Sequence, residues 1–454
     1  MGRSKENMNK NTARLLFLCL CFSAAEARAQ FQINEMLLGN PAIRSDFFQY
    51  MVRPYRDRTE RFRSARVEAL QMDLAVDDES AQLTLENWGD NRADMRAGSS
   101  RLKVAAGGLG GTTYNGVNKD DKYTGNTAGV YARAGAFELE ASHVKQEVSA
   151  YGSSAAPDES VRNSGGGAFS FGGEGTRFGL HANADQTKIP ASLLKMPNAS
   201  AGAALAFRAG IFELGATADM VGRGIEVTDG SFEAKRNGPM IGAQAMIKPF
   251  AGFKAALRGS MAKLSGESHT FGVKYDFEGE NTEAGMRAEW KFEAIPLTLA
   301  AGYEKLIMEP EYRLGNSRVR TLTENRLKSS AAAFHFFGGR FLLGVQLEEL
   351  VIGSDSYTNN VFTGHLHQTL FGGSGGAEVW LLPGFCVRGS FRRMEIQDDT
   401  STAETFYNTI AAGVGLKGES LSLDVSARKM KGDNKNDPKQ DEFADAKAVL
   451  SYRF

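Results

Sequence analysis

Three short strings in the chain carry residue types that could perform catalysis or bind phosphate. Residues 372–376 read Gly-Gly-Ser-Gly-Gly and match the pattern of a hydrolase nucleophile elbow, in which a strand leads into a helix. Residues 413–418 match G-x-G-x-x-G, which binds a dinucleotide inside a strand–helix–strand unit. Ser260 and Lys263 match S-x-x-K, which needs a helix to bring both side chains together. All three chemistries therefore require helices beside the motif.

A fourth candidate is the pair His365 and His367, which stand two positions apart and could share one face of a strand. A structural or catalytic metal site takes three or four protein ligands, and neither a cysteine nor a carboxylate cluster accompanies the pair. We therefore expect no metal and no cofactor, and we interpret the histidines as a polar pair at a rim or in a lumen.

The elements around these strings show strand periodicity rather than helix periodicity. Residues 286–293 read Met, Arg, Ala, Glu, Trp, Lys, Phe and Glu, so that apolar and charged side chains alternate strictly. Residues 212–220 alternate in the same way. A strand places successive side chains on opposite faces, whereas a helix would scatter these charges around its surface. The catalytic-looking strings thus fall in strands without their helices, and we expect no enzyme.

Composition excludes several other classes of protein. The chain has 454 residues, 24% of them charged, with a net charge of −1, which argues against a nucleic-acid partner and against intrinsic disorder. After the first thirty residues, no stretch offers the roughly 20 apolar residues that a spanning helix needs. A helical membrane protein is therefore not expected.

The N-terminus predicts export from the cytoplasm. Basic residues precede an apolar run at residues 15–25, and Ala27 and Ala29 supply the small residues of a cleavage site, so residues 1–29 are interpreted as a secretory signal peptide. Cleavage after Ala29 would leave Cys386 as the one cysteine of the exported chain, which excludes an intramolecular disulfide.

From about residue 96 onward, alternating segments of about ten residues come in pairs joined by tight turns, and the pairs are joined by longer polar stretches. This arrangement predicts an all-β, antiparallel, up-and-down transmembrane barrel of about eighteen strands (16–20), with short periplasmic turns and long external loops, over residues 96–454. Residues 30–95 remain a periplasmic extension, a lumen plug or an extra hairpin. A barrel of this kind predicts that the protein lies in the outer membrane of a Gram-negative bacterium, surrounded by outer-membrane lipid.

Prolines test this scheme, because proline cannot donate a hydrogen bond to a strand ladder. We expect Pro249, Pro296 and Pro383 in tight turns, Pro197 and Pro310 in long loops, and Pro239 at the start of a strand.

The C-terminal segment supplies a resemblance. Leu450, Tyr452 and Phe454 share one face of the last alternating stretch, and a terminal Phe with an aromatic residue two positions before it resembles the C-terminal signature of bacterial outer-membrane barrels. The resemblance implies an assembly signal that the barrel-assembly machinery reads. It identifies a porin-like superfamily and no particular family within it.

The polar face of the strands must point into the barrel, because the other face lies in hydrocarbon. At about eighteen strands the interior is too wide for wall side chains to fill, so water or a plug occupies it. The charged residues that we expect to line this lumen are Arg133, Glu138, Glu140, Arg208, Glu213, Lys254, Arg258, Arg287, Glu289, Lys291, Glu293, Arg388, Arg392 and Arg428.

We expect from these observations a porin-like channel for the passive diffusion of small hydrophilic solutes or ions. The alternative is a non-transporting barrel whose loops bind a partner or a surface, as an adhesin or scaffold does, and a barrel-borne enzyme comes third. Whether the chain forms a homo-oligomer stays open.

Overall fold

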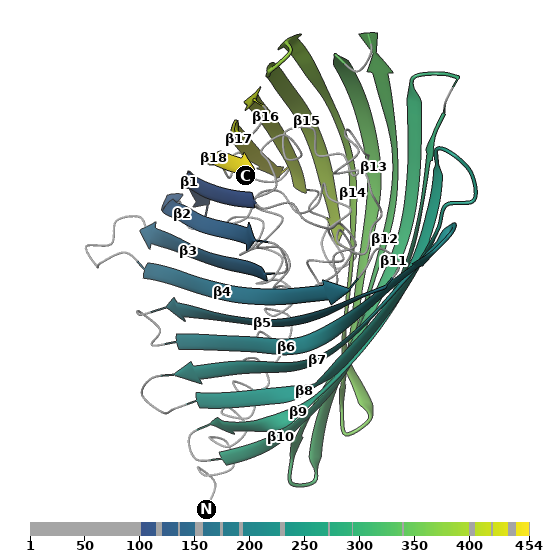
Figure 1. The fold of residues 1–454 in the computed structure, drawn as a ribbon. Coiled ribbons are helices and arrows are strands. Elements are labelled where there is room, and N and C mark those ends of the chain that lie inside the picture. Colours follow the sequence, from purple (N-terminus) through teal and green to yellow (C-terminus); the bar gives the residue numbers. More distant parts are fainter. Residues whose placement is uncertain are drawn as a thin grey trace, which may run out of the picture.

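A computed structural model describes the region that the sequence assigns to the barrel (Figure 1). The described residues are 101–453 without 115–119, 135–136, 150–157, 173–175, 190–193, 228–231, 271–272, 293, 338–339, 399–404, 419–420 and 435–441. For some strand residues the structure describes the backbone alone. The predicted signal peptide and residues 30–95 lie outside the described residues.

The described part of the chain forms eighteen strands. Their bounds are β1 Arg101–Tyr114, β2 Asp120–Ala134, β3 Phe137–Ser149, β4 Asp158–Gly172, β5 Thr176–Ile189, β6 Leu194–Ala209, β7 Phe212–Val227, β8 Phe232–Ile247, β9 Phe253–Thr270, β10 Val273–Lys291, β11 Leu297–Leu314, β12 Ser317–Phe336, β13 Phe341–Thr358, β14 Val361–Leu382, β15 Phe385–Asp398, β16 Thr405–Lys417, β17 Leu421–Asn434 and β18 Glu442–Arg453.

The strands pair with their neighbours in sequence, and every pairing is antiparallel. β1 pairs with β2 on one side and with β18 on the other, where Arg101 stands opposite Arg453. The hydrogen-bonded order of the eighteen described strands therefore returns to its starting strand, and none of these strands has an unpaired edge. The predicted all-β, antiparallel up-and-down fold is confirmed. No helix in the described part of the chain is long and apolar enough to cross a membrane.

One end of the sheet, which we call the near end, carries the tight turns that the sequence predicts. These turns include residues 210–211, 250–252 and 383–384, and β1 begins and β18 ends at this same end. Gly210 and Gly252 adopt positive φ values of 56° and 79°. At Gly252 a Cβ atom would also lie 2.1 Å from the backbone oxygen of Lys291, so only glycine fits this turn.

Toward the far end the strands are longer, and several connections are shorter, than the sequence predicts. The strands have 12 to 22 residues rather than about ten, and the longest, β9 to β14, have 18 to 22. Between these long strands the far-end connections shrink to residues 271–272, 315–316 and 359–360. Polar stretches that the sequence suggests as long loops are therefore hairpin arms, because alternation with period two continues through them.

Three prolines also contradict expectation, because they lie inside strands. Pro197 is in β6, Pro239 in the middle of β8 and Pro310 in β11. Each is absent from the register on one side of its strand, where the β6–β7, β8–β9 and β11–β12 pairings skip it. A strand tolerates proline where the ladder is interrupted, and the pairing on the other side, such as that of Pro310 with Gly279, still holds it in the sheet.

Candidate functional site: the two faces of the strand wall

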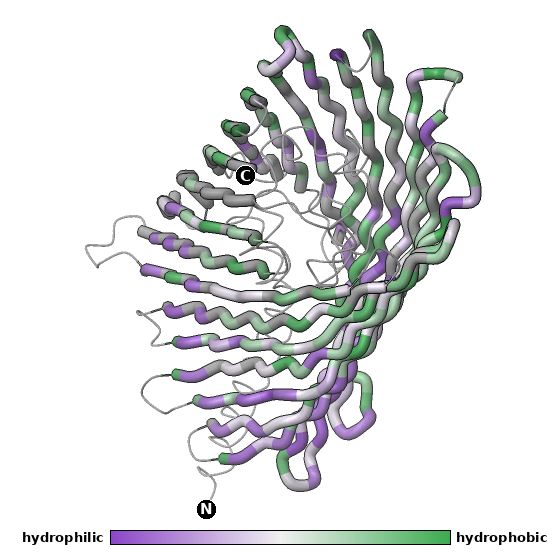
Figure 2. Tube along the Cα trace, in the orientation of Figure 1, coloured by the Kyte–Doolittle hydropathy of each residue, from purple (hydrophilic) through white to green (hydrophobic). Residues whose placement is uncertain are grey.

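The outer face of the wall carries an apolar band next to the near end. On β7 this band covers residues 212–220, on β9 residues 253–261 and on β10 residues 282–290. Its large side chains are exposed, for example Leu214 at 45%, Leu257 at 61% and Trp290 at 44%. About nine residues of tilted strand match the apolar height of an outer-membrane barrel. Figure 2 shows that the hydrophilic residues gather toward the other end of these strands.

Aromatic side chains concentrate at the near edge of this apolar band. Phe171 and Phe178 stack across the turn between β4 and β5 with ring centroids 5.5 Å apart. Trp290 and Phe292 stack at 4.4 Å beside the connection between β10 and β11. Phe336 and Phe341 lie 5.8 Å apart across the β12–β13 turn. Rings in this position form the aromatic girdle that barrels place at the headgroup level of a membrane.

The inner face at the level of the apolar band carries buried polar side chains among apolar ones such as Met246 and Ala256. Asp219, Glu378 and Arg392 are 5%, 1% and 2% exposed, and Thr217 on the strand of Asp219 and Thr409 opposite Arg392 are also buried. Their positions alternate with exposed apolar residues on the same strands, so they lie on the inner side of the sheet. These three side chains have almost no contact with water, and removing a charge from water costs several kcal/mol, so their polar groups need partners within the wall.

Two of these carboxylates have well-defined surroundings. The carboxylate of Asp219 lies over Gly202 on the neighbouring strand, where a Cβ atom would come 2.1 Å from Asp219 Oδ1. The indole Nε1 of Trp380 donates a hydrogen bond of 2.7 Å to Glu378 Oε1. Glu378 also stands opposite Arg388 in the β14–β15 register. The wall thus holds its inner charges in fixed positions.

Among the predicted lumen-lining residues, the structure describes the side chains of only two. Arg392 is buried in the inner wall and Lys291 is exposed at the near end of β10, and their role as lumen-lining residues stays a prediction. Glu293 lies outside the described residues. The others are described by backbone position alone: Arg133, Glu138, Glu140, Arg208, Glu213, Lys254, Arg258, Arg287, Glu289, Arg388 and Arg428.

The register places several of these residues directly opposite a residue of the other sign. Arg133 pairs with Glu138 between β2 and β3, and Arg208 pairs with Glu213 between β6 and β7. Lys254 pairs with Glu289 between β9 and β10. Charges of opposite sign at paired positions favour the sheet register.

The predicted assembly signal lies only in part within the described residues. Leu450 is exposed on β18, where it pairs with Val104 of β1. For Tyr452 the structure describes the backbone in β18, and Phe454 lies outside the described residues. The role of these three residues stays a prediction.

Beyond the apolar band, the outer face changes from apolar to charged. We call this surface the outer collar; it comprises Lys235, Lys263, Glu267, Lys274, Asp276, Glu278, Glu280, Lys305, Glu309, Glu311, Arg313, Arg318, Arg320, Glu324, Arg326, Lys328, Glu349 and Asp355. On β9, for example, Met261 is the last apolar residue of the band and Lys263 begins the collar.

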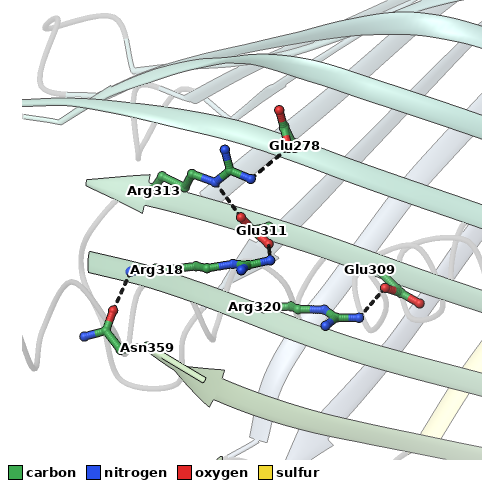
Figure 3. A network of polar contacts seen from close by, with 7 residues as sticks. All are labelled: Glu278, Glu309, Glu311, Arg313, Arg318, Arg320 and Asn359. Carbon is green, nitrogen blue, oxygen red and sulfur yellow. Dashed lines mark hydrogen bonds and ion pairs between the residues drawn. The ribbon is translucent and has the colours of Figure 1, made fainter. Parts of the chain in front are cut away.

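Ion pairs across neighbouring strands connect the outer collar (Figure 3). Arg313 on β11 donates to Glu278 on β10 at 3.0 Å and to Glu311 on its own strand at 2.5 Å, and Arg318 on β12 also bonds Glu311. The Glu311 side chain is only 9% exposed because both guanidinium groups cover it. Arg320 pairs with Glu309 at 2.5 Å. The collar is thus a cross-strand network with one buried carboxylate at its centre.

The inner face of the wall contains two apolar clusters. One cluster joins Val221, Met240, Ala262, Leu264 and Phe277, all buried, with Tyr312 packed against them. A second joins Leu327, Leu350, Leu370 and Met394, with Ile352 and Tyr407 against them. Toward the far end, the long strands β9 to β14 therefore have a charged outer side and an inner side with two apolar clusters.

The catalytic-looking strings occupy strands. Residues 372–376 lie inside β14, and residues 413–417 lie in β16. His365 and His367 stack at 6.2 Å on the outer side of β14, and His365 Nδ1 is 2.5 Å from Asp355 Oδ1 on β13. Within the described residues, no group of three or more His, Cys, Asp or Glu side chains could hold a metal ion.

Arg236, Phe277 and Tyr312 are a cluster that sequence reasoning missed. Their positions belong to polar stretches that the sequence suggests as loops, so the sequence alone does not assign these side chains to the inner face of a strand. The signal was present, because Phe277 lies within the alternating run of residues 275–280.

Comparison with known proteins finds distant resemblance in structure alone. No protein-family model matches the chain, and no curated protein matches it significantly. The alcaligin outer membrane receptor FauA from Bordetella pertussis is similar over 79% of this chain and 76% of its own, with 10% identity and a TM-score of 0.41. OpdK from Pseudomonas aeruginosa, solved with vanillate, has 10% identity over 78% of this chain and 98% of its own, with a TM-score of 0.41.

A third similar structure is OccAB2 from Acinetobacter baumannii, with 11% identity over 78% of this chain and 98% of its own, and a TM-score of 0.38. Because these identities and TM-scores are low, the function of this chain has to be argued from its own residues.

Proposed function

We propose that the protein is an outer-membrane β-barrel that forms a porin-like channel for small hydrophilic solutes or ions. The observation that carries the proposal is the arrangement of the two faces at the level of the apolar band. There, exposed Leu214 and Leu257 lie outside, while buried Asp219, Glu378 and Arg392 lie inside. A wall with hydrocarbon on one side and charge on the other separates lipid from water.

The size of the ring supports an aqueous interior. Eighteen strands close in sequence order, and a barrel of this size is too wide for the side chains of its own wall to fill. Such a lumen would pass small solutes selectively without reacting with them, so the proposal assigns no catalytic residue and no cofactor.

The export signal and the C-terminal signature support the same location. Residues 1–29 would direct the chain out of the cytoplasm, and the face that contains Leu450 would be read by the barrel-assembly machinery. A Gram-negative outer membrane is the compartment that combines both requirements. A non-transporting barrel would share all of these features, and only its lumen would differ.

The test is conductance of the purified, folded full-length protein in a planar lipid bilayer. The channel proposal predicts stepwise current increments that scale with bulk conductivity of the salt solution. Heat-modifiable migration on a denaturing gel provides the folding control. A barrel that folds and inserts but stays electrically silent would contradict the channel and favour an adhesin or scaffold, for which the outer collar is the available surface.

A further inference from the structure

The inner wall beyond the apolar band holds a guanidinium group in a defined aromatic setting. Arg236 on β8 donates a hydrogen bond from Nη2 to the hydroxyl of Tyr312 on β11, with a length of 2.6 Å. Its Cζ atom lies 3.9 Å from the centroid of the Phe277 ring on β10 and 5.3 Å from that of Tyr312. We call these three residues the Arg236 patch.

The ring beneath the guanidinium is itself held in place. A Cβ atom at Gly279 would lie 2.7 Å from Cζ of Phe277, so the ring occupies the space that the glycine leaves open. Tyr312 meets Phe277 edge-on, with centroids 5.2 Å apart and an interplanar angle of 62°. Phe277 is 4% exposed, whereas Arg236 is only half-buried. The guanidinium is therefore the layer of the patch that faces the lumen.

The three strands place the Arg236 patch on the inner side of the barrel. Arg236 shares the even positions of β8 with buried Met240 and Met246, while Ile241 is exposed on the outer side. The β9–β10 and β10–β11 registers run without a shift through this region, so Phe277 keeps the inner orientation of its strand.

The setting suits a particular kind of ligand. A guanidinium group binds a carboxylate through parallel hydrogen bonds, and it is more weakly hydrated than an ammonium group, so that it also accepts flat apolar groups against its face. Apolar neighbours such as Leu264 and Val221 lower the local dielectric constant, which strengthens a charge-assisted hydrogen bond. The contacts to Tyr312 and Phe277 preorganise the side chain, which reduces the entropy lost on binding.

We propose that the Arg236 patch is a binding site, at the far end of the lumen, for organic anions that carry a flat apolar body. The anionic group lies against the edge of the Arg236 guanidinium, and the apolar body lies along the inner wall. This inference rests on the proposed function in one respect, because solutes reach the patch through a lumen that is open to water. It narrows the solute class from hydrophilic solutes in general to amphipathic anions.

The test is equilibrium binding of benzoate to the full-length protein folded in detergent, followed by saturation-transfer NMR titration. Arg236→Gln is expected to weaken benzoate binding at least about tenfold, since a hydrogen-bonded charge is lost. Arg236→Lys keeps the charge but loses the planar fork and is expected to fall between wild type and Arg236→Gln. The matched control is Arg326→Gln, which removes an exposed arginine from the outer collar and leaves binding unchanged.

Two further ligands test whether binding requires both the negative charge and the aromatic ring of benzoate. Benzyl alcohol has the ring without the charge and acetate has the charge without the ring, so both are expected to bind more weakly than benzoate. Tyr312→Phe removes the hydroxyl that holds the guanidinium and is expected to weaken benzoate binding by a smaller factor than Arg236→Gln does. Each variant is first shown to be folded by heat-modifiable migration.

Wild-type protein that does not bind benzoate saturably, or an Arg236→Gln variant that binds as well as wild type, would overturn the proposal. The same preparations are measured in planar bilayers. Conductance without benzoate binding would contradict the Arg236 patch alone, whereas benzoate binding without conductance would contradict the channel and leave the patch as a binding site on a closed barrel.

Discussion

The near and far parts of the same strands differ in the side chains of their outer face. Along β9, the outer residues 255–261 are apolar, and the next outer residues, from Lys263 to His269, are polar or charged. The buried inner residues of the same strand show no such change, since Ala256 and Ala262 lie at the level of the band and Leu264 and Ser268 lie beyond it. Alternation with period two persists throughout, so the surroundings of the outer face change rather than the fold.

This difference locates the boundary between hydrocarbon and water along the strands. An apolar outer face followed by a charged one is expected where a strand leaves hydrocarbon for water, and the change falls about nine residues from the near end on several strands. The far part of β9 to β14 then behaves as a wall in water, charged outside and partly apolar inside. Loops are not needed to build this projection, because the hairpins themselves extend.

The largest expected effect comes from placing a charge in the apolar band on the outer face of one strand. Leu257→Lys places a charge in the apolar band and is expected to destabilise the inserted barrel by about 2–4 kcal/mol. Ser265→Lys places the same charge on the same face in the collar and is expected to change stability by less than about 0.5 kcal/mol. Urea unfolding of the protein in lipid vesicles measures both, and equal effects would contradict the boundary.

A second prediction concerns the inner wall. Gly202→Ala would bring a methyl group against Asp219 Oδ1 and against the backbone oxygen of Ala218, at 2.1 and 2.5 Å. Because the backbone contact cannot rotate away, a loss of about 1–3 kcal/mol is expected in the same unfolding assay. Gly364→Ala is the control, since a Cβ atom there meets nothing within 4 Å. Matching stabilities for the two variants would mean that Asp219 is not fixed over Gly202.

A third prediction separates two carboxylates of the outer collar. Glu311 lies under two guanidinium groups, and Glu311→Gln is expected to cost about 1–2 kcal/mol because charged hydrogen bonds are lost from a buried position. Glu309 makes one exposed pair with Arg320, and Glu309→Gln is expected to cost about 0–1 kcal/mol, decreasing as salt is added. A larger loss for Glu309→Gln than for Glu311→Gln would contradict the geometry of the network.

The smallest effect is on ion selectivity. Lys254 and Arg258 occupy even positions of β9, as the buried Ala256 and Ala262 do. Changing both to Glu is expected to shift the reversal potential toward cations at low ionic strength, with the shift shrinking at high ionic strength, where charges are screened beyond about 3 Å at 1 M salt. An unchanged reversal potential at low salt would show that these positions do not line the narrow part of the lumen.

Much of the barrel could be predicted from the sequence, because its strongest signal is local. Alternation in residues such as 286–292 indicates a strand by itself, and the glycines at 210 and 252 indicate where hairpins turn. The antiparallel order followed from these local signals. The same alternation predicts on which face of β15 Arg392 lies, but not that its side chain is buried.

The far end could not be predicted in the same way. Pro310 indicated a loop, and the structure instead tolerates it in β11, where the ladder skips it. The Arg236 patch depends on three strands that lie up to 76 residues apart in sequence, so its assembly required the register. A polarity pattern that reverses within one strand also defeats any rule that assigns a single lipid face to the whole strand.

The most direct test is a spin-label accessibility scan along the outer face of β9. Single cysteines at positions 255, 257, 261, 263, 265, 267 and 269, in a background in which buried Cys386 is replaced by Ser, are labelled and measured in lipid vesicles. We predict that oxygen accessibility dominates from 255 to 261 and that accessibility to a water-soluble nickel complex dominates from 263 to 269. Water exposure at every position, or lipid exposure that continues to 269, would contradict a membrane boundary between Met261 and Lys263.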